Sequence, residues 1–154
     1  MTPETYLRVA VTPALSLLPP AMDSTNARRM LLAIALQESS LEHRRQVRGP
    51  ARSYLQFELG GLRGVLRHDA TQQLAAGVVN ALDYSDLSPS DLHAALEHND
   101  PLAAAMGRLL LYTHPRALPD MEEAGWEYYF WLWRPGKPHP ERWPACWERA
   151  GEAI

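Results

Sequence analysis

Cys146 is the only cysteine among the 154 residues, so no disulfide can form within the chain. No apolar run approaches the length needed to cross a bilayer, and the formal net charge of −3 gives no argument for nucleic acid or an anionic membrane as a partner. With 46% hydrophobic and 21% charged residues, the composition is that of an ordinary globular chain. We therefore expect a single domain spanning residues 1–154, without nucleic-acid binding or membrane insertion.

The sequence also lacks the common motifs for metals and phosphates. Its six histidines are scattered, and none pairs with the cysteine at a metal-ligand spacing, which predicts no metal site. The glycine-rich stretch at 60–64 is not followed by the Lys-Ser/Thr pair of a phosphate loop. The apolar stretch at 9–18 is interrupted by Pro13 and has little positive charge before it, so we interpret it as mature protein, without a secretion signal. We expect no cofactor.

Helix-capping residues and prolines divide most of the chain into helices. The fold class predicted from them is mainly α, a single domain with six or seven helices. Pro13 is expected to kink the first of these helices. The expected helices span residues 4–18, 25–38, 70–82, 89–98, 101–112, 122–133 and 140–149.

Residues 40–68 are polar and glycine-bearing, and they show no helical period. From Ser53 to Leu59 apolar and polar residues alternate, and Gly60-Gly61 could form a tight turn, so we expect a short β-tongue or hairpin near 53–66. One strand face would then carry Tyr54, Gln56 and Glu58. An ordinary surface hairpin with a solvated polar face is the alternative.

Glu38 is the residue whose position most strongly suggests chemistry. It follows the uninterrupted apolar run 30–36, whose apolar residues lie all round a helix and so predict a buried one. Both burial and the negative end of the helix dipole disfavour ionisation of a carboxyl group there. We expect a raised pKa for Glu38, as a general acid working near neutral pH requires.

Three blocks of the sequence resemble the lysozyme-like superfamily, most closely the soluble lytic transglycosylase-type domains of small phage and prophage proteins. The first is the apolar helix ending in Glu38-Ser39, and the second is Ala51-Arg52-Ser53-Tyr54-Leu55-Gln56, similar to an Ala-x-Gly-Leu-Met-Gln motif. The third is the helix opened by Asp100-Pro101. The chain departs from the pattern at Pro50 and Ser53, where glycines are usual. The Tyr-Asn-Ala-Gly motif is also missing, and residues 126–129 stand in its place.

The resemblance implies cleavage of the β-1,4 bond between N-acetylmuramic acid and N-acetylglucosamine in peptidoglycan. Glu38 would protonate the glycosidic oxygen, and Ser39 and Gln56 would orient the carboxyl group and the sugar. Glu58 is the candidate second carboxylate, needed by a hydrolase and dispensable in a transglycosylase. The other candidate substrate-binding residues are Tyr54 and Tyr128.

Such an enzyme would be carried by a phage and act at the periplasmic cell wall, either from the virion or from within the infected cell, with phage structural proteins as possible partners. An alternative is a tail or ejection protein of the virion that keeps this fold with weak or no catalysis. Aromatic residues crowd the C-terminal quarter. Trp126, Tyr129, Phe130 and Trp133 share one helix face suited to core packing, whereas Tyr128 and Trp131 point elsewhere and could stack on a sugar or a partner.

Overall fold

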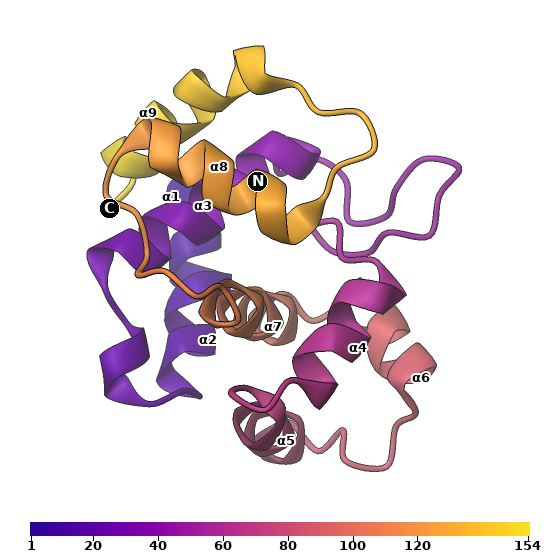
Figure 1. The fold of residues 1–154 in the computed structure, drawn as a ribbon. Coiled ribbons are helices and arrows are strands. Elements are labelled where there is room, and N and C mark those ends of the chain that lie inside the picture. Colours follow the sequence, from indigo (N-terminus) through magenta and orange to yellow (C-terminus); the bar gives the residue numbers. More distant parts are fainter.

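The computed structural model describes residues 1–154, and all its regular structure is helical (Figure 1). The mainly α class predicted from the sequence is confirmed. None of the helices has both the length and the apolar character that a membrane crossing would need. In chain order the elements are α1 Pro3–Tyr6, η1 Leu7–Val11, α2 Thr12–Ser16, η2 Pro20–Met22, α3 Thr25–Ser39, α4 Leu59–Arg67, α5 Gln72–Ala81, α6 Pro89–Ala95, α7 Asp100–Tyr112, α8 Glu122–Trp133, η3 Pro140–Arg142 and α9 Trp143–Glu152.

The first helical segment runs without interruption from α1 through the π-type turn η1 into α2. Pro13 lies in the first turn of α2, directly after the π-type turn η1. The wider backbone of η1 accommodates the N–H that proline lacks. Taking α1 to α2 as one helix, the chain has eight helices, one or two more than expected.

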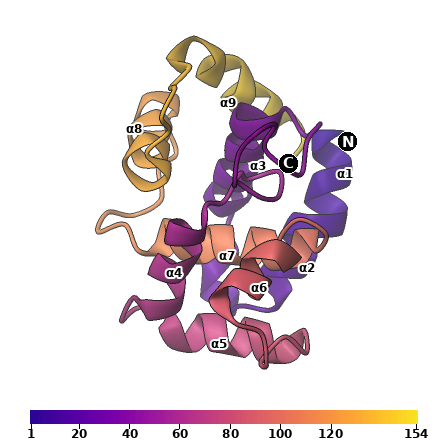
Figure 2. The same cartoon turned by 90° about the vertical axis from the view of Figure 1, so that its right-hand side faces the viewer.

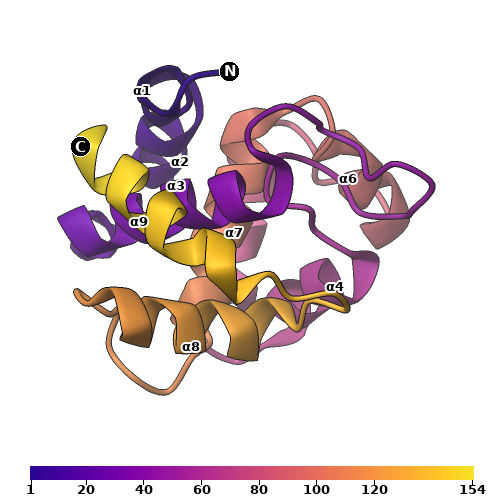
Figure 3. The same cartoon turned by 90° about the horizontal axis from the view of Figure 1, so that it is seen from above.

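Two nearly fully buried helices, α3 and α7, form the centre of the molecule (Figure 2). Ser24 caps α3 by accepting a hydrogen bond from the Ala27 N–H at 3.1 Å, and Asn99 caps α7 in the same way. Helices α4, α5 and α6 lie on one side of α7, whereas α3, α8 and α9 lie on the other (Figures 1 and 2). Seen from above, α9 runs across α3, with α8 beside it (Figure 3).

The predicted β-tongue near 53–66 is wrong, and the chain has only isolated bridges there. Residues 53–56 form a tight turn closed by reciprocal backbone hydrogen bonds between Arg52 and Phe57 at 2.9 and 2.8 Å. Ser53 and Gln56 adopt left-handed backbone angles in this turn, with φ of 66° and 49°. Such angles interrupt the extended conformation that alternating residues favour.

Helix α4 follows the turn and contains Gly60 and Gly61, so these glycines do not form the predicted hairpin turn. Glycine is a poor helix former, but Leu62 and Val65 are fully buried on the face of α4 that packs against the rest of the domain. Tertiary packing therefore decides the conformation of this segment. Its helical spacing rests on few apolar residues, and the glycines between them favoured the prediction of a turn.

Candidate active site

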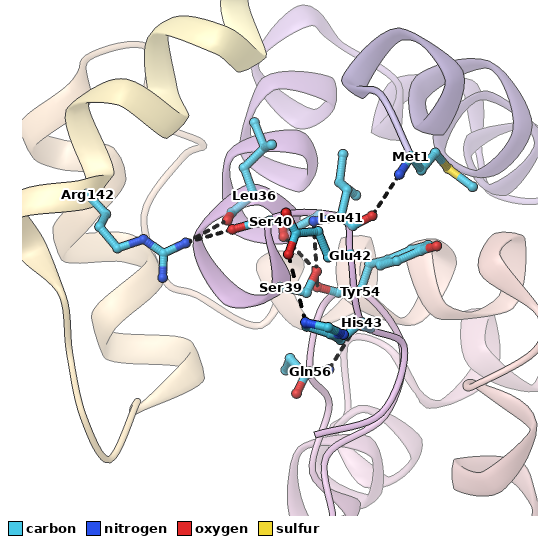
Figure 4. A network of polar contacts seen from close by, with 11 residues as sticks. Met1, Leu36, Ser39, Ser40, Leu41, Glu42, His43, Tyr54, Gln56 and Arg142 are labelled. Atoms are coloured by element: carbon cyan, nitrogen blue, oxygen red, sulfur yellow. Dashed lines mark hydrogen bonds and ion pairs between the residues drawn. The ribbon is translucent and has the colours of Figure 1, made fainter. Parts of the chain in front are cut away.

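The C-terminal end of α3 is where segments distant in sequence converge. Ser40 ends the helix in the left-handed conformation, and its N–H donates to the Leu36 carbonyl. Arg142, from η3, donates through Nη2 to the Ser40 hydroxyl at 2.9 Å (Figure 4). The Gln37 side chain donates to the His139 carbonyl at 3.0 Å, so the segment between α8 and α9 is fastened to the end of α3. These contacts fix the backbone on both sides of Glu38.

The Ser39 hydroxyl links α3 to the 53–56 turn. Its oxygen lies 2.8 Å from the Tyr54 carbonyl and accepts from the Leu41 N–H at 3.2 Å (Figure 4). The Ala35 carbonyl, at 2.9 Å, shares the single hydroxyl proton with Tyr54. Because Ser39 is buried and its hydrogen-bonding capacity is used, its hydroxyl orients the turn rather than reaching a ligand directly.

Glu38 is half-buried at this helix end. Burial raises the pKa of its carboxyl group, and the negative charge of Glu58 raises that pKa further. Two effects oppose the shift: a hydrogen bond from Tyr129 and the positive charge of Arg142 both lower the pKa of Glu38. Burial is the largest effect, so the net shift is upward, in the direction expected from the sequence.

Tyr129, on α8, is the side chain in direct contact with this carboxyl group. Its hydroxyl donates to Glu38 Oε1 at 2.6 Å, a length typical of an O–H bond to a charged or strongly polar acceptor. Since Oε1 accepts this bond, the proton of a neutral Glu38 belongs on Oε2. The arrangement therefore directs the acidic proton of Glu38 to one oxygen.

An aromatic cluster holds the Tyr129 ring in place. Trp143 stacks on it at 5.3 Å with an interplanar angle of 11°, while Trp126 and Trp133 pack at 5.3 and 6.3 Å. Trp133 also donates through Nε1 to the Leu55 carbonyl at 2.8 Å, which joins α8 to the 53–56 turn. Three aromatic contacts leave Tyr129 only 2% exposed and fix its hydroxyl against Glu38.

Glu58 lies directly before α4 as its N-cap residue, and its side chain is exposed without a capping hydrogen bond. It is close enough to influence the ionisation of Glu38. Its charge is the smallest of the four influences on the pKa of Glu38, and no hydrogen bond joins the two carboxylates. Glu58 comes from a helix start instead of the expected strand face.

The remaining candidates near the turn are occupied by internal contacts. Gln56 donates through Nε2 to the Ser53 carbonyl at 2.7 Å and, more weakly, to the His43 carbonyl at 3.5 Å. Tyr54 is buried, edge-to-face against Tyr6 at 5.6 Å and beneath the Arg44 guanidinium at 4.9 Å. Of these two residues, only the half-buried Gln56 keeps part of its surface free for a ligand.

Tyr128 points to a different part of the molecule. Its single hydroxyl proton is shared between the carbonyls of Leu111 and Arg116, which lie 2.9 and 3.1 Å from the hydroxyl oxygen, and its ring stacks on His114 at 3.9 Å. It lines two hollows near the C-terminal end of α7, neither of which is lined by Glu38 or Glu58. The sequence grouped Tyr128 with Glu38, but the structure does not bring them together.

Sequence reasoning missed Tyr129 and Arg142 as neighbours of Glu38. The helical spacing of Trp126, Tyr129 and Trp133 predicted a packing face, and a polar hydroxyl on such a face needs a buried partner. The need for a buried partner could therefore have pointed to Tyr129. On the same predicted packing face, Phe130 is in fact 46% exposed. Arg142 carried no comparable signal, because the loop that brings it to α3 has no regular pattern.

The geometry at Glu38 suits proton donation: a half-buried carboxyl group whose pKa is raised by burial, with one oxygen held by a tyrosine. No group of three or more metal-binding side chains occurs in the structure. No protein-family model, curated protein or solved structure matches the chain.

Proposed function

We propose that the protein is a peptidoglycan-degrading glycosidase, a lytic transglycosylase or muramidase that uses Glu38 as its general acid. The observation that carries this proposal is the 2.6 Å hydrogen bond from Tyr129 to a half-buried Glu38 whose pKa is raised. The resemblance of the 38–39 and 51–56 segments to lytic transglycosylase motifs supplies the substrate class. The turn that carries the second segment is bonded to Ser39, next to Glu38.

In the first step, Glu38 would donate its proton to the oxygen that links C1 of N-acetylmuramic acid to C4 of N-acetylglucosamine. The C1–O bond breaks, the N-acetylglucosamine leaves with a free hydroxyl group, and positive charge develops at C1. Glu38 is then ionised. Tyr129 and Arg142 both favour the charged form, and so they would stabilise the carboxylate that this step produces.

Two second steps are compatible with these residues. In a transglycosylase, ionised Glu38 takes the proton of the muramic acid C6 hydroxyl, whose oxygen attacks C1 and closes a 1,6-anhydro ring. In a muramidase, a carboxylate such as Glu58 stabilises the positive charge or activates the water that attacks C1. Glu58 is exposed and uncommitted to other hydrogen bonds, so it is free for either role.

The test is incubation with purified sacculi followed by mass spectrometry of the soluble products. Anhydro-muropeptides identify the transglycosylase, and muropeptides with reducing ends identify the hydrolase. Glu38→Gln should lower the rate at least about 100-fold, the usual loss on removing a general acid. Glu148→Gln on the exposed face of α9 is the matched control and should retain full activity. Absence of products from the wild type, or undiminished activity of Glu38→Gln, would refute the proposal.

A second candidate is a structural part of a virion, favoured by the exposed apolar residues of the α8 region. Phe130 and Trp131 are 46% and 50% exposed, and Met121 is 67% exposed. Such side chains are suited to burial against a partner. Stable assembly with tail proteins, combined with no release of muropeptides, would favour this role over the enzyme.

A further inference from the structure

Arg108 is a buried cation for which the structure provides no anion. It lies on α7 and is only 5% exposed. Its single hydrogen bond runs from Nε to the Met22 carbonyl at 2.8 Å, and its Nη1 is buried without a partner. The ring centre of Tyr112 lies 5.8 Å from its guanidinium carbon. None of the ion pairs in the structure includes Arg108.

Burial lowers the pKa of Arg108, and no carboxylate acts on it in return. An arginine remains charged even so, because its ordinary pKa lies far above neutrality. Asp23, adjacent to Met22 in the chain, is already held by Arg28 through two bonds of 2.8 and 2.7 Å. A buried, unpaired charge is costly, so an anion that reached Arg108 would gain a strong interaction.

A hollow of about 350 Å³ gives access to this arginine. Its wall contains Arg108 together with Tyr112, His114, Arg116 and Tyr128. Tyr112 and Arg116 are exposed, so the hollow opens to solvent and carries a second positive charge at its rim. Its volume fits a small organic molecule.

The wall of the hollow is aromatic and continues into a second hollow of about 270 Å³. His114 stacks on Tyr128 at 3.9 Å, and Trp131 meets the His114 ring edge-on at 4.8 Å. His114 Nδ1 accepts a hydrogen bond from the Arg116 N–H at 3.0 Å, and burial lowers the pKa of His114. The neutral ring therefore carries its proton on Nε2, where it is available as a donor. Glu127 lines only the second hollow, and its negative charge would repel an anion placed there.

We propose that these adjoining hollows bind a small organic anion, whose carboxylate or phosphate group pairs with Arg108 and whose planar or apolar body lies against His114, Tyr128 and Trp131. Arg116 would attract the anion at the rim, and Glu127 would set the orientation by repelling it from the far end. This site does not depend on Glu38, since no residue of the Glu38 cluster lines either hollow.

Binding can be tested by NMR titration at constant ionic strength with benzoate, phenyl phosphate and the neutral isostere benzamide. The signals followed are the Arg108 Nε–H and the Trp131 indole N–H. We expect saturable shifts of both with benzoate or phenyl phosphate, and at least tenfold weaker binding of benzamide. Tighter binding of phenyl phosphate than of benzoate would identify a phosphate ligand, and the reverse a carboxylate.

Arg108→Gln should weaken binding of the anions at least tenfold, whereas Arg63→Gln, which removes an exposed arginine of α4 that lines neither hollow, should leave it unchanged. Glu38→Gln should also bind normally, which separates this proposal from the proposed glycosidase. If Arg108→Gln does not fold, Arg116→Gln should still weaken binding severalfold. Equal binding of benzoate and benzamide, or no saturable shift at Arg108 in the wild type, would overturn the proposal.

Discussion

The Tyr129 hydroxyl donates a 2.6 Å hydrogen bond to Glu38 Oε1, joining α8 to the end of α3 across 91 residues of sequence. The bond opposes the effect of burial, which favours the neutral acid. A proton donor must be neutral before the reaction and charged after it, so neither form can be stabilised too strongly. Burial raises the pKa of Glu38 and the Tyr129 hydrogen bond lowers it, so measuring this pKa in variants tests the site directly.

Replacing Tyr129 by phenylalanine should raise the pKa of Glu38. The substitution removes a hydrogen bond that lowers this pKa and leaves the burial that raises it. Loss of the bond should also cost about 1 kcal/mol of stability. The pKa can be followed directly through the side-chain carboxyl ¹³C shift of Glu38. Tyr128→Phe is the matched control, because the Tyr128 hydroxyl bonds only to backbone carbonyls, and it should leave the Glu38 titration unchanged.

Glu58 and Arg142 should move the same titration in opposite directions. Glu58→Gln removes a negative charge that raises the pKa of Glu38, so the pKa should fall. Arg142→Gln removes a positive charge that lowers it, so the pKa should rise. If Glu38 is the general acid, activity declines as pH rises through this pKa. The declining limb of the pH–rate profile should then shift to lower pH in Glu58→Gln and to higher pH in Arg142→Gln. Shifts in the same direction would contradict the proposed electrostatic balance.

The sequence predicted the helices that carry strong local signals. Caps at Ser24, Ser88 and Asn99 begin helices at or next to the expected positions, because these short-range hydrogen bonds depend only on neighbouring residues. Glu38 at the end of a buried helix followed from the apolar run alone. Its raised pKa followed from the same argument, and burial is indeed its main cause.

The segment 53–67 could not be predicted in the same way. Its alternation indicated a strand, but Ser53 and Gln56 have left-handed angles. The bonds from Ser39 and Trp133 that hold this turn come from α3 and α8, which are distant in sequence. The Tyr129–Glu38 pair depends likewise on how α8 packs against α3. Periodicity identifies which face of a helix is buried, but not which neighbour it meets.

Glu38→Gln should stabilise the protein above pH 5 and have little effect at pH 4. A carboxyl group whose pKa is raised in the folded state contributes most stability when protonated, and that contribution is lost as pH rises from its ordinary value of about 4.5 through the raised value. Glutamine is uncharged throughout and avoids this loss. Denaturant unfolding of both proteins across this pH range measures the difference, and the exposed Glu148→Gln serves as control. A difference that grows toward low pH would contradict the raised pKa.

Gly125 and Gly64 should respond oppositely to substitution by alanine. A Cβ atom at Gly125 would approach the Trp147 ring to 2.6 Å, and that ring is buried beneath the Arg29 guanidinium at 4.6 Å and cannot move aside easily. Gly125→Ala should therefore destabilise the protein by about 1–3 kcal/mol and loosen the packing of α8, which positions Tyr129.

Gly64 provides the matched control. At this position, on the exposed face of α4, a Cβ atom would meet nothing within 4 Å. Gly64→Ala should instead stabilise the protein by up to about 1 kcal/mol, through helix propensity alone. Denaturant unfolding measures both changes. Equal effects of the two substitutions would contradict a close contact between Gly125 and the Trp147 ring.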